Sequence, residues 1–317
     1  NRPDARARVE TLALRPIESG SRLAPDETRY RGAFHLHPNG SGELSLVNEL
    51  PIDKYLYGVV RKEIAPNWPM ASVKAQAVAA RSFVVARMRN GNNHKHFHVG
   101  STHTSQVYGG FDAEEPRIRE AVDATVGEVL TYENDVVPAY FHANSGGHIE
   151  SAENVWNGSK TPYIIPKKDP WSLETQHSNW STSVDRTRIV ESLESSDLPR
   201  PDLPLHLERA ERLPSGRTRS LSYNAASDGR VTVDANDFRM AVGPGVVKST
   251  WFRSLRETGG QVRMSGRGWG HGIGLSQWGA RAMARKGHSY EEILSFYFDR
   301  AELMARYGLG ASRGKRV

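Results

Sequence analysis

The stretch GRGWGHGIGLSQWGA, residues 266–280, constrains the fold of this chain more than any other. Glycine occupies every second position at its start, and Arg267, Trp269 and His271 lie between the glycines. Glycine loses more conformational entropy on folding than any other residue, so such a run indicates a demanding backbone path or the close approach of a partner. Two explanations remain open: the backbone lies against a large ligand, or it packs around an Ala-rich helix expected at 71–89.

The surroundings of the glycine run narrow the choice of ligand. A strand, QVRMSG, precedes it and a helix is expected from about Ser276, a topology that can bind phosphate. The glycine spacing, however, matches neither the dinucleotide-binding pattern nor the Walker pattern. Aromatic faces flanked by hydrogen-bond donors are typical of carbohydrate-binding grooves. We therefore expect Arg267, Trp269 and His271 to face sugar, together with Gln277.

Composition excludes several classes of protein. The 317 residues contain no cysteine, which rules out disulfides and thiolate metal sites. No apolar run approaches the roughly 18 residues of a membrane helix, so we expect no integral membrane segment. The net charge of +6 favours an anionic environment such as a cell-wall polymer. Basic and acidic residues are interleaved along the chain, which argues against nucleic acid as a partner.

Hydrophobic patterning predicts an α+β fold. We expect a single mixed domain with curved, largely antiparallel sheets, an Ala-rich central helix and a surface insertion. The expected regions are N-terminal strands in 1–40, a catalytic domain in 41–310 with an insertion at about 183–216, and a basic tail in 311–317. The expected local signals are an Asn-Gly turn at 39–40, Asp53 as an N-cap, a long helix at 69–89 ending at Gly91, turns at 133–135 and 228–229, helices at 276–286 and 289–298, and a capping box of Ser289 and Glu292.

Glu63 is the strongest catalytic candidate. It lies at the end of an apolar helical stripe that begins at Leu56, on a face otherwise reserved for the core. Desolvation raises the pKa of a carboxyl group, and Trp68 follows closely enough to wall a partly dry pocket. A protonated carboxylic acid is what general-acid cleavage of an ether-like bond requires. The alternative is a surface glutamate at a helix end, or an ion pair with Lys74 or Arg81.

Four histidines, His94, His96, His98 and His103, fall within ten residues. Alternate histidines on a strand share a face and form a metal geometry. Their surroundings are loop-like and rich in hydrogen-bonding residues, which favours solvated histidines instead. We predict no metal here.

The stretch FHANSGGHIE, from Phe141, contains a serine beside two glycines. It lacks the G-x-S-x-G pattern of a nucleophile elbow. We expect Asn144, Ser145 and His148 to belong to a polar loop that lines a groove, and a plain turn is the alternative.

Four blocks carry a family resemblance: YLYGVVRKEIAPNWPMASVKAQAVAARSF, STHTSQVYGG, VVPAYFHANSGGHIESAENVW and GRGWGHGIGLSQWGARAMARKGHSYEEILSFYF. In this order, over roughly residues 40–300, they resemble the SpoIID/LytB family, named for a sporulation protein and an amidase enhancer. The resemblance implies activity on peptidoglycan glycan strands as a lytic transglycosylase, which cuts between N-acetylmuramic acid and N-acetylglucosamine and leaves a 1,6-anhydro end. The family's catalytic glutamate lies just before the KAQAVAAR helix, where this chain has Glu63.

The resemblance also implies a substrate-binding set and no cofactor. Some members bind zinc with cysteine and histidine near the block STHTSQVY, but this chain has Thr104 and Ser105 there and no cysteine, so that site is not carried over. The expected substrate-binding residues in the first blocks are Trp68, Lys74, Gln76, Arg81, Thr102, His103, Ser105, Gln106 and Tyr108; some of them would hydrogen-bond the glycan and others would support Glu63.

The resemblance leaves two functions open. One is the enzyme, and the other is a non-catalytic glycan-binding enhancer with a cell-wall amidase as its partner. Both imply a bacterial protein exported to the periplasm or cell wall. The chain begins with Asn1 and not with Met, which fits a removed signal peptide.

Overall fold

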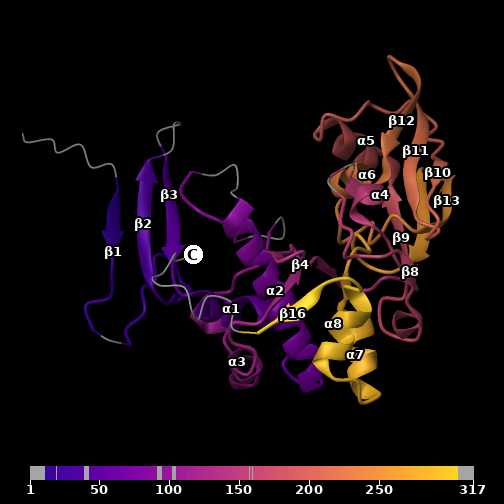
Figure 1. Cartoon of the computed structure of the whole chain (residues 1–317). Coiled ribbons are helices and arrows are strands. Elements are labelled where there is room, and N and C mark those ends of the chain that lie inside the picture. Colours follow the sequence, from indigo (N-terminus) through magenta and orange to yellow (C-terminus); the bar gives the residue numbers. More distant parts are fainter. Residues whose placement is uncertain are drawn as a thin grey trace, which may run out of the picture. The chain divides into compact units, whose positions relative to one another are not determined.

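The computed structural model describes residues 11–18, 20–38, 43–90, 95–101, 105–156, 158 and 160–305. The chain divides into two compact units (Figure 1). Unit 1 comprises Asn1–Pro138 and Leu303–Val317, and unit 2 comprises Ala139–Glu302. Helices and several small, mostly antiparallel sheets occur in both units, which confirms the α+β prediction. None of the helices in these described ranges is long and apolar enough to cross a membrane.

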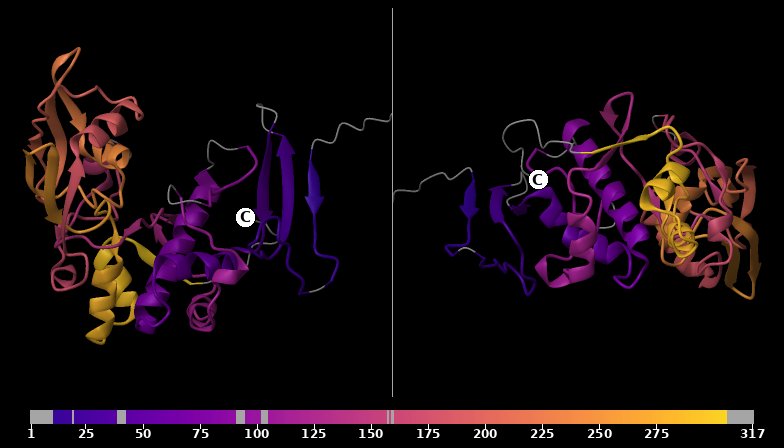
Figure 2. Two further views of the ribbon diagram at one scale, coloured as in Figure 1. Left: turned by 180° about the vertical axis from the view of Figure 1, so that it is seen from behind. Right: turned by 60° about the horizontal axis from the view of Figure 1, so that its bottom comes forward.

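Unit 1 combines a helical layer with two small sheets. Its elements are β1 (Leu12–Leu14), β2 (Ala33–Pro38), β3 (Leu44–Glu49), α1 (Ile52–Glu63), α2 (Met70–Asn90), the 3-10 helix η1 (Phe111–Ala113), α3 (Pro116–Asp123), β4 (Val129–Tyr132), β5 (Asp135–Val136) and β16 (Glu302–Met304). The strand orders are β1-β2-β3 and β16-β4-β5. Helices α1, α2 and α3 pack side by side (Figures 1 and 2).

Helix α2 is the centre of unit 1, as the Ala-rich sequence predicts. Between Ser72 and Ala86 every side chain except that of half-buried Lys74 is buried, and such a helix must lie inside a core. Because alanine side chains are short, α1, α3 and β4 approach it closely. Gly91, the predicted end of this helix, lies outside the described residues.

The strands β2 and β3 form the predicted antiparallel pair, with Ala33 opposite Glu49 and Pro38 opposite Leu44. The Asn-Gly turn between them lies outside the described residues. This pairing joins residues on both sides of position 40 in one sheet. Strand β2, which lies before position 40, is therefore part of the same sheet as β3 in unit 1.

Unit 2 contains the remaining elements: β6 (Phe141–His142), β7 (His148–Ile149), α4 (Ala152–Trp156), β8 (Lys167–Lys168), η2 (Pro170–Ser172), β9 (Asn179–Asp185), α5 (Arg186–Glu194), β10 (Glu208–Arg212), β11 (Thr218–Ala225), β12 (Gly229–Asp234), α6 (Ala235–Val242), β13 (Phe252–Thr258), β14 (Gln261–Arg267), β15 (Leu275–Ser276), α7 (Gln277–Arg285) and α8 (Tyr290–Tyr297). Two three-stranded antiparallel sheets, β10-β11-β12 and β13-β14-β9, share one core with α5 and α6. The short strands β15 and β6 form a parallel pair.

The segment 183–216, predicted as a surface insertion, supplies part of this core. Ile189, Leu193 and Leu205 are buried and pack with the strands of unit 2. Strand β9 pairs with β14 and β10 pairs with β11, so both ends of the segment are tied into sheets.

Most local signals are confirmed and one is wrong. Ser289 and Glu292 form the predicted capping box of α8, and the hairpin at 228–229 joins β11 to β12. The N-cap of α1, however, is Pro51, without a side-chain hydrogen bond. Asp53 binds Arg81 instead, because a buried guanidinium needs a carboxylate more than a helix end does.

Candidate functional site

Glu63 is the last residue of α1, at the partly exposed end of a buried stripe. Leu56, Val59 and Val60 are fully buried, whereas Glu63 is half-buried. The predicted apolar face is therefore confirmed, and the carboxyl group lies where the face meets solvent. Burial raises the pKa of the Tyr55 hydroxyl, and electrostatic interactions with Tyr108 and Glu63 raise it further. Glu63 therefore lies close enough to interact with a buried phenol of the same helix.

Arg81, the predicted ion-pair partner of Glu63, is engaged elsewhere. Its Nε and one terminal nitrogen donate to Asp53 Oδ1 at 3.0 and 2.8 Å. The other donors bind the carbonyl oxygens of Glu128 and Val122, both at 3.2 Å. Arg81 is 2% exposed, so in this structure it fastens α1 and α3 to α2.

Two predicted residues, Gln76 of α2 and Ser105, have buried side-chain polar atoms with no hydrogen-bond partner among the described residues. Both amide atoms of Gln76, which is 1% exposed, lack a partner, and so does the hydroxyl of Ser105. Unpaired buried polar groups are costly, which makes these atoms candidates for contact with water or ligand. Trp68 is 6% exposed and Lys74 is half-buried, and their predicted contacts with substrate stay predictions.

The block STHTSQVY connects α1 and α2 to an aromatic cluster. Gln106 donates to the carbonyl oxygen of Ala80 at 3.2 Å and accepts a 3.4 Å hydrogen bond from the Tyr55 hydroxyl. The rings of Tyr55 and Tyr108 lie 5.0 Å apart. Thr102 and His103 lie outside the described residues, so their predicted roles stay predictions.

Of the predicted histidine cluster, His94 and His103 also lie outside the described residues. His96 stacks on His37 of β2, with ring centroids 4.1 Å apart. Within the described part of the chain, the carboxylates and histidines form no group of three with metal-binding geometry.

In unit 2, the glycine run packs against the unit's own backbone. Gly268, Gly270, Gly272 and Gly274 all have positive φ, between 68° and 109°. A methyl group on Gly268 would lie 2.6 Å from the carbonyl oxygen of Asn144. The glycines thus lie against backbone and side chains of unit 2 itself. Packing of the run around the 71–89 helix, which belongs to unit 1, stays a prediction.

His271 uses both ring nitrogens inside the run. Nε2 donates to the carbonyl oxygen of Phe141 at 2.9 Å, and Nδ1 accepts from the amide of Ile273 at 3.0 Å. Burial lowers its pKa to about 3, so the ring is neutral at ordinary pH. Its carbon edge and face pack against Trp156 and His142, with centroids at 4.9 and 5.2 Å. Sugar contact by His271 stays a prediction, and its polar atoms are already occupied.

Asn144 and Ser145 are completely buried, and their hydrogen bonds fix the conformation of their loop. The Asn144 side chain donates to three acceptors in 172–176 and accepts from the amide of Gly146 at 2.7 Å. Ser145 Oγ donates to Asp169 Oδ2 at 2.7 Å. These contacts match the geometry of the alternative reading, a plain turn, and substrate binding by the pair stays a prediction.

Asp169 is a buried residue that the sequence does not reveal. Its carboxylate accepts from Ser145, Ser172 and Tyr297, and burial raises its pKa. These partners are distant in sequence and Asp169 matches no local motif. It ties the 144–147 loop to η2 and α8.

Trp269 is half-buried and carries polar neighbours that sequence reasoning missed. Lys248 Nζ lies 4.6 Å from the ring centroid, and His177 contacts the ring edge-to-face at 4.6 Å. His177 also contacts Trp278, at 5.7 Å. The other predicted residues of unit 2 have separate environments. Arg267 lies over the Trp251 ring, Gln277 is buried at the start of α7, and the His148 ring is hydrogen-bonded to the carbonyl oxygen of Ile149.

Comparison with known proteins gives concordant matches. Residues 40–132 match the family model described as stage II sporulation protein. An uncharacterised protein of Brachyspira hyodysenteriae is 31% identical over 262 residues, covering 82% of this chain and 68% of the relative. The amidase enhancer of Bacillus subtilis is 30% identical, covering 77% of this chain and 39% of the relative. Stage II sporulation protein D of the same organism is 27% identical, covering 81% and 75%.

The matches span both units, and the family model includes Glu63, α2 and the aromatic cluster around Tyr108. The features that define the candidate site thus lie in the part of the chain that its relatives share. The chain belongs to the SpoIID/LytB family.

Proposed function

We propose that this protein is a peptidoglycan lytic transglycosylase and that Glu63 is its catalytic acid and base. The observation that carries the proposal is the half-buried carboxyl group of Glu63 at the end of a buried helical stripe, close enough to the buried Tyr55 hydroxyl to raise its pKa. It is supported by relatives named for sporulation and amidase enhancement. Export to the cell wall is part of the proposal.

The chemistry needs one carboxyl group. Glu63, protonated, donates its proton to the oxygen of the bond between N-acetylmuramic acid and N-acetylglucosamine, while positive charge develops at the anomeric carbon. The resulting carboxylate takes the proton of the muramoyl 6-hydroxyl as that oxygen attacks the anomeric carbon. The bond to the leaving sugar breaks, the 1,6-anhydro ring forms, and the carboxyl group is regenerated without a water molecule.

The test compares wild type with Glu63→Gln on intact and on amidase-stripped peptidoglycan, with soluble products read by mass spectrometry. Wild type is expected to release products lighter by one water than hydrolysed fragments. Glu63→Gln keeps the size of the side chain but removes the acid, so a loss of activity of about 10³-fold is expected, in the middle of the roughly 10²–10⁴-fold contribution of general acid–base catalysis. Glu120→Gln, an exposed glutamate on α3, is the matched control and should cleave normally.

The second candidate is a non-catalytic enhancer of a cell-wall amidase, favoured by the similarity to the Bacillus subtilis amidase enhancer. It predicts that wild type and Glu63→Gln sediment equally with peptidoglycan and that neither releases sugar. It also predicts faster peptide release when either protein is added to an amidase. That pattern would replace the enzyme proposal.

A further inference from the structure

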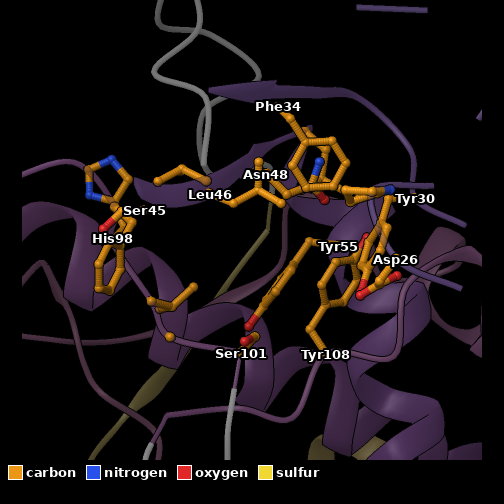
Figure 3. A pocket seen from close by; sticks show the side chains of 16 residues that line it. Asp26, Tyr30, Phe34, Ser45, Leu46, Asn48, Tyr55, His98, Ser101 and Tyr108 are labelled. Carbon is orange, nitrogen blue, oxygen red and sulfur yellow. The ribbon is translucent and has the colours of Figure 1, made fainter. Parts of the chain in front are cut away.

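Unit 1 contains a cavity of about 440 Å³. One side is formed by Phe34, Leu46 and Asn48 of the β2-β3 hairpin, and the other by Tyr55 of α1 with Tyr108 and Ser101 (Figure 3). The volume falls in the range of roughly 300–1,000 Å³ that is usual for small-molecule sites. Part of the lining precedes residue 40, outside the segment that matches the family model.

Four aromatic rings give the cavity its apolar surface. Tyr30 contacts Phe34 edge-to-face at 5.3 Å and Tyr108 at 5.9 Å, and Tyr108 contacts Tyr55 at 5.0 Å. The rings hold one another in place, because each is packed against at least one other. They therefore offer a preformed surface on which the C–H face of a flat, rigid ligand can rest.

The polar groups of the cavity suit a neutral ligand rich in hydroxyl groups. Asp26 supplies a carboxylate acceptor, and the Tyr108 hydroxyl has no hydrogen-bond partner among the described residues. Neither lysine nor arginine occurs among the described lining residues. The neighbouring Arg29 and Arg31 are paired with Asp112 and Glu114, at 2.6 and 2.5 Å. His98 is the cavity's titratable base, but the described lining offers an anionic ligand no permanently positive side chain although the net charge of the chain is +6.

We propose that this cavity binds one N-acetylated amino sugar of the glycan strand. An acetamido sugar has an apolar ring face for the tyrosines, hydroxyl donors for Asp26 and no charge. The inference rests on the proposed function, which supplies the glycan. Tyr55 precedes Glu63 by eight residues, about 12 Å along the helix axis, so one helix contributes both to the cavity and to the proposed catalytic site.

The test uses a matched pair of substitutions on β3. Leu46 lines the cavity and Leu44 does not, yet both are exposed leucines of the same strand, 44% and 62% exposed. Leu46→Trp fills the cavity, and Leu44→Trp adds the same bulk outside it. Each is made in the Glu63→Gln background to prevent turnover. Binding of the N-acetylglucosamine trimer is measured by calorimetry, with thermal unfolding as the check on folding.

Leu46→Trp is expected to raise the dissociation constant at least tenfold, and Leu44→Trp to leave it within twofold. Asp26→Ala should weaken binding threefold to tenfold, whereas Glu27→Ala, its exposed neighbour outside the cavity, should not. Equal binding by the two tryptophan variants overturns the inference. So does loss of binding to a diaminopimelate-containing stem peptide while the trimer still binds, because the ligand would then be the peptide.

The cleavage assay separates this inference from the proposed function. If wild type cleaves peptidoglycan and Leu46→Trp binds the trimer normally, the enzyme proposal stands and the cavity inference fails. If wild type cleaves nothing and Leu46→Trp still abolishes trimer binding, the cavity is a sugar site in a binding protein.

Discussion

Two buried polar side chains, Gln76 of unit 1 and His271 of unit 2, differ in how their polar atoms are used. Both amide atoms of Gln76 have no hydrogen-bond partner among the described residues. Both ring nitrogens of His271 are hydrogen-bonded to the backbone of unit 2. The glycine run, the most distinctive stretch of the sequence, therefore uses its histidine for packing, whereas helix α2 contains a buried amide that is open to water or ligand.

The largest expected effect is the loss of stability on substitution of Gly274, in the glycine run of unit 2. Its φ is +68°, and a methyl group there would collide with the carbonyl oxygen of Tyr140. The left-handed conformation costs about 1–2 kcal/mol for alanine, and displacement of backbone adds to it. Gly274→Ala is expected to lower the free energy of unfolding by about 3 kcal/mol or more. Urea unfolding followed by tryptophan fluorescence measures this in unit 2, where every tryptophan except Trp68 lies.

Gly287→Ala is the matched control. Gly287 also has positive φ, +92°, but no atom lies within 4 Å of the added methyl group. Its cost should therefore be limited to about 1–2 kcal/mol of backbone strain. Equal losses in the two variants would show that close packing of the run contributes nothing beyond conformation.

Asp169→Asn is expected to have the next largest effect. The amide group presents N–H donors to hydroxyls of Ser145, Ser172 and Tyr297 that now donate to the carboxylate. Loss of such buried hydrogen bonds costs about 2–3 kcal/mol. The exposed Asp228→Asn in the β11-β12 turn should change the free energy of unfolding by less than about 0.5 kcal/mol. If the two substitutions cost the same, the buried network does not stabilise unit 2.

Acid should destabilise unit 2 through its buried histidines. Burial lowers the pKa of His271 to about 3 and that of His142 well below its usual value. The unfolded chain then binds more protons than the native one, so stability is complete above about pH 6.5 and falls as the pH drops towards 3. Each histidine contributes a slope of up to about 1.4 kcal/mol per pH unit.

Urea unfolding at intervals from pH 7.5 to 5 measures this slope. His271→Gln should reduce it, since a glutamine amide does not titrate. His206→Gln, at an exposed position, is the control and should leave the slope unchanged. A flat profile in the wild type would mean that the two rings are protonated in the native state.

Short-range patterns account for most of what could be predicted. The Ala-rich run predicts α2, the serine and glutamate of α8 predict its capping box, and Asp228-Gly229 predicts a hairpin. In each case the residues that determine the structure lie within a few positions of one another. The stripe ending in Glu63 belongs to the same class, because helical spacing alone reveals it.

Long-range pairing accounts for what was missed. The sequence predicts Asp53 as a helix cap. Its carboxylate instead accepts a hydrogen bond from the buried guanidinium of Arg81, 28 residues further along the chain. Asp169 is recognisable only through hydroxyl groups 24 and 128 residues away. The cavity joins Tyr30 to Tyr108 in the same way. Sequence periodicity contains no information about such partners.

The smallest expected effect is that of removing one hydroxyl group, on Tyr108 of unit 1. Tyr108→Phe keeps the ring on Tyr55 and removes a hydroxyl that has no partner in the described residues. The free energy of unfolding should therefore change by less than about 0.5 kcal/mol. If the Tyr108 hydroxyl binds substrate, the same change should raise KM for peptidoglycan twofold to tenfold. This is the equivalent of one hydrogen bond of about 0.5–1.5 kcal/mol. Unchanged KM with reduced stability would mean that this hydroxyl, like those of unit 2, serves the fold.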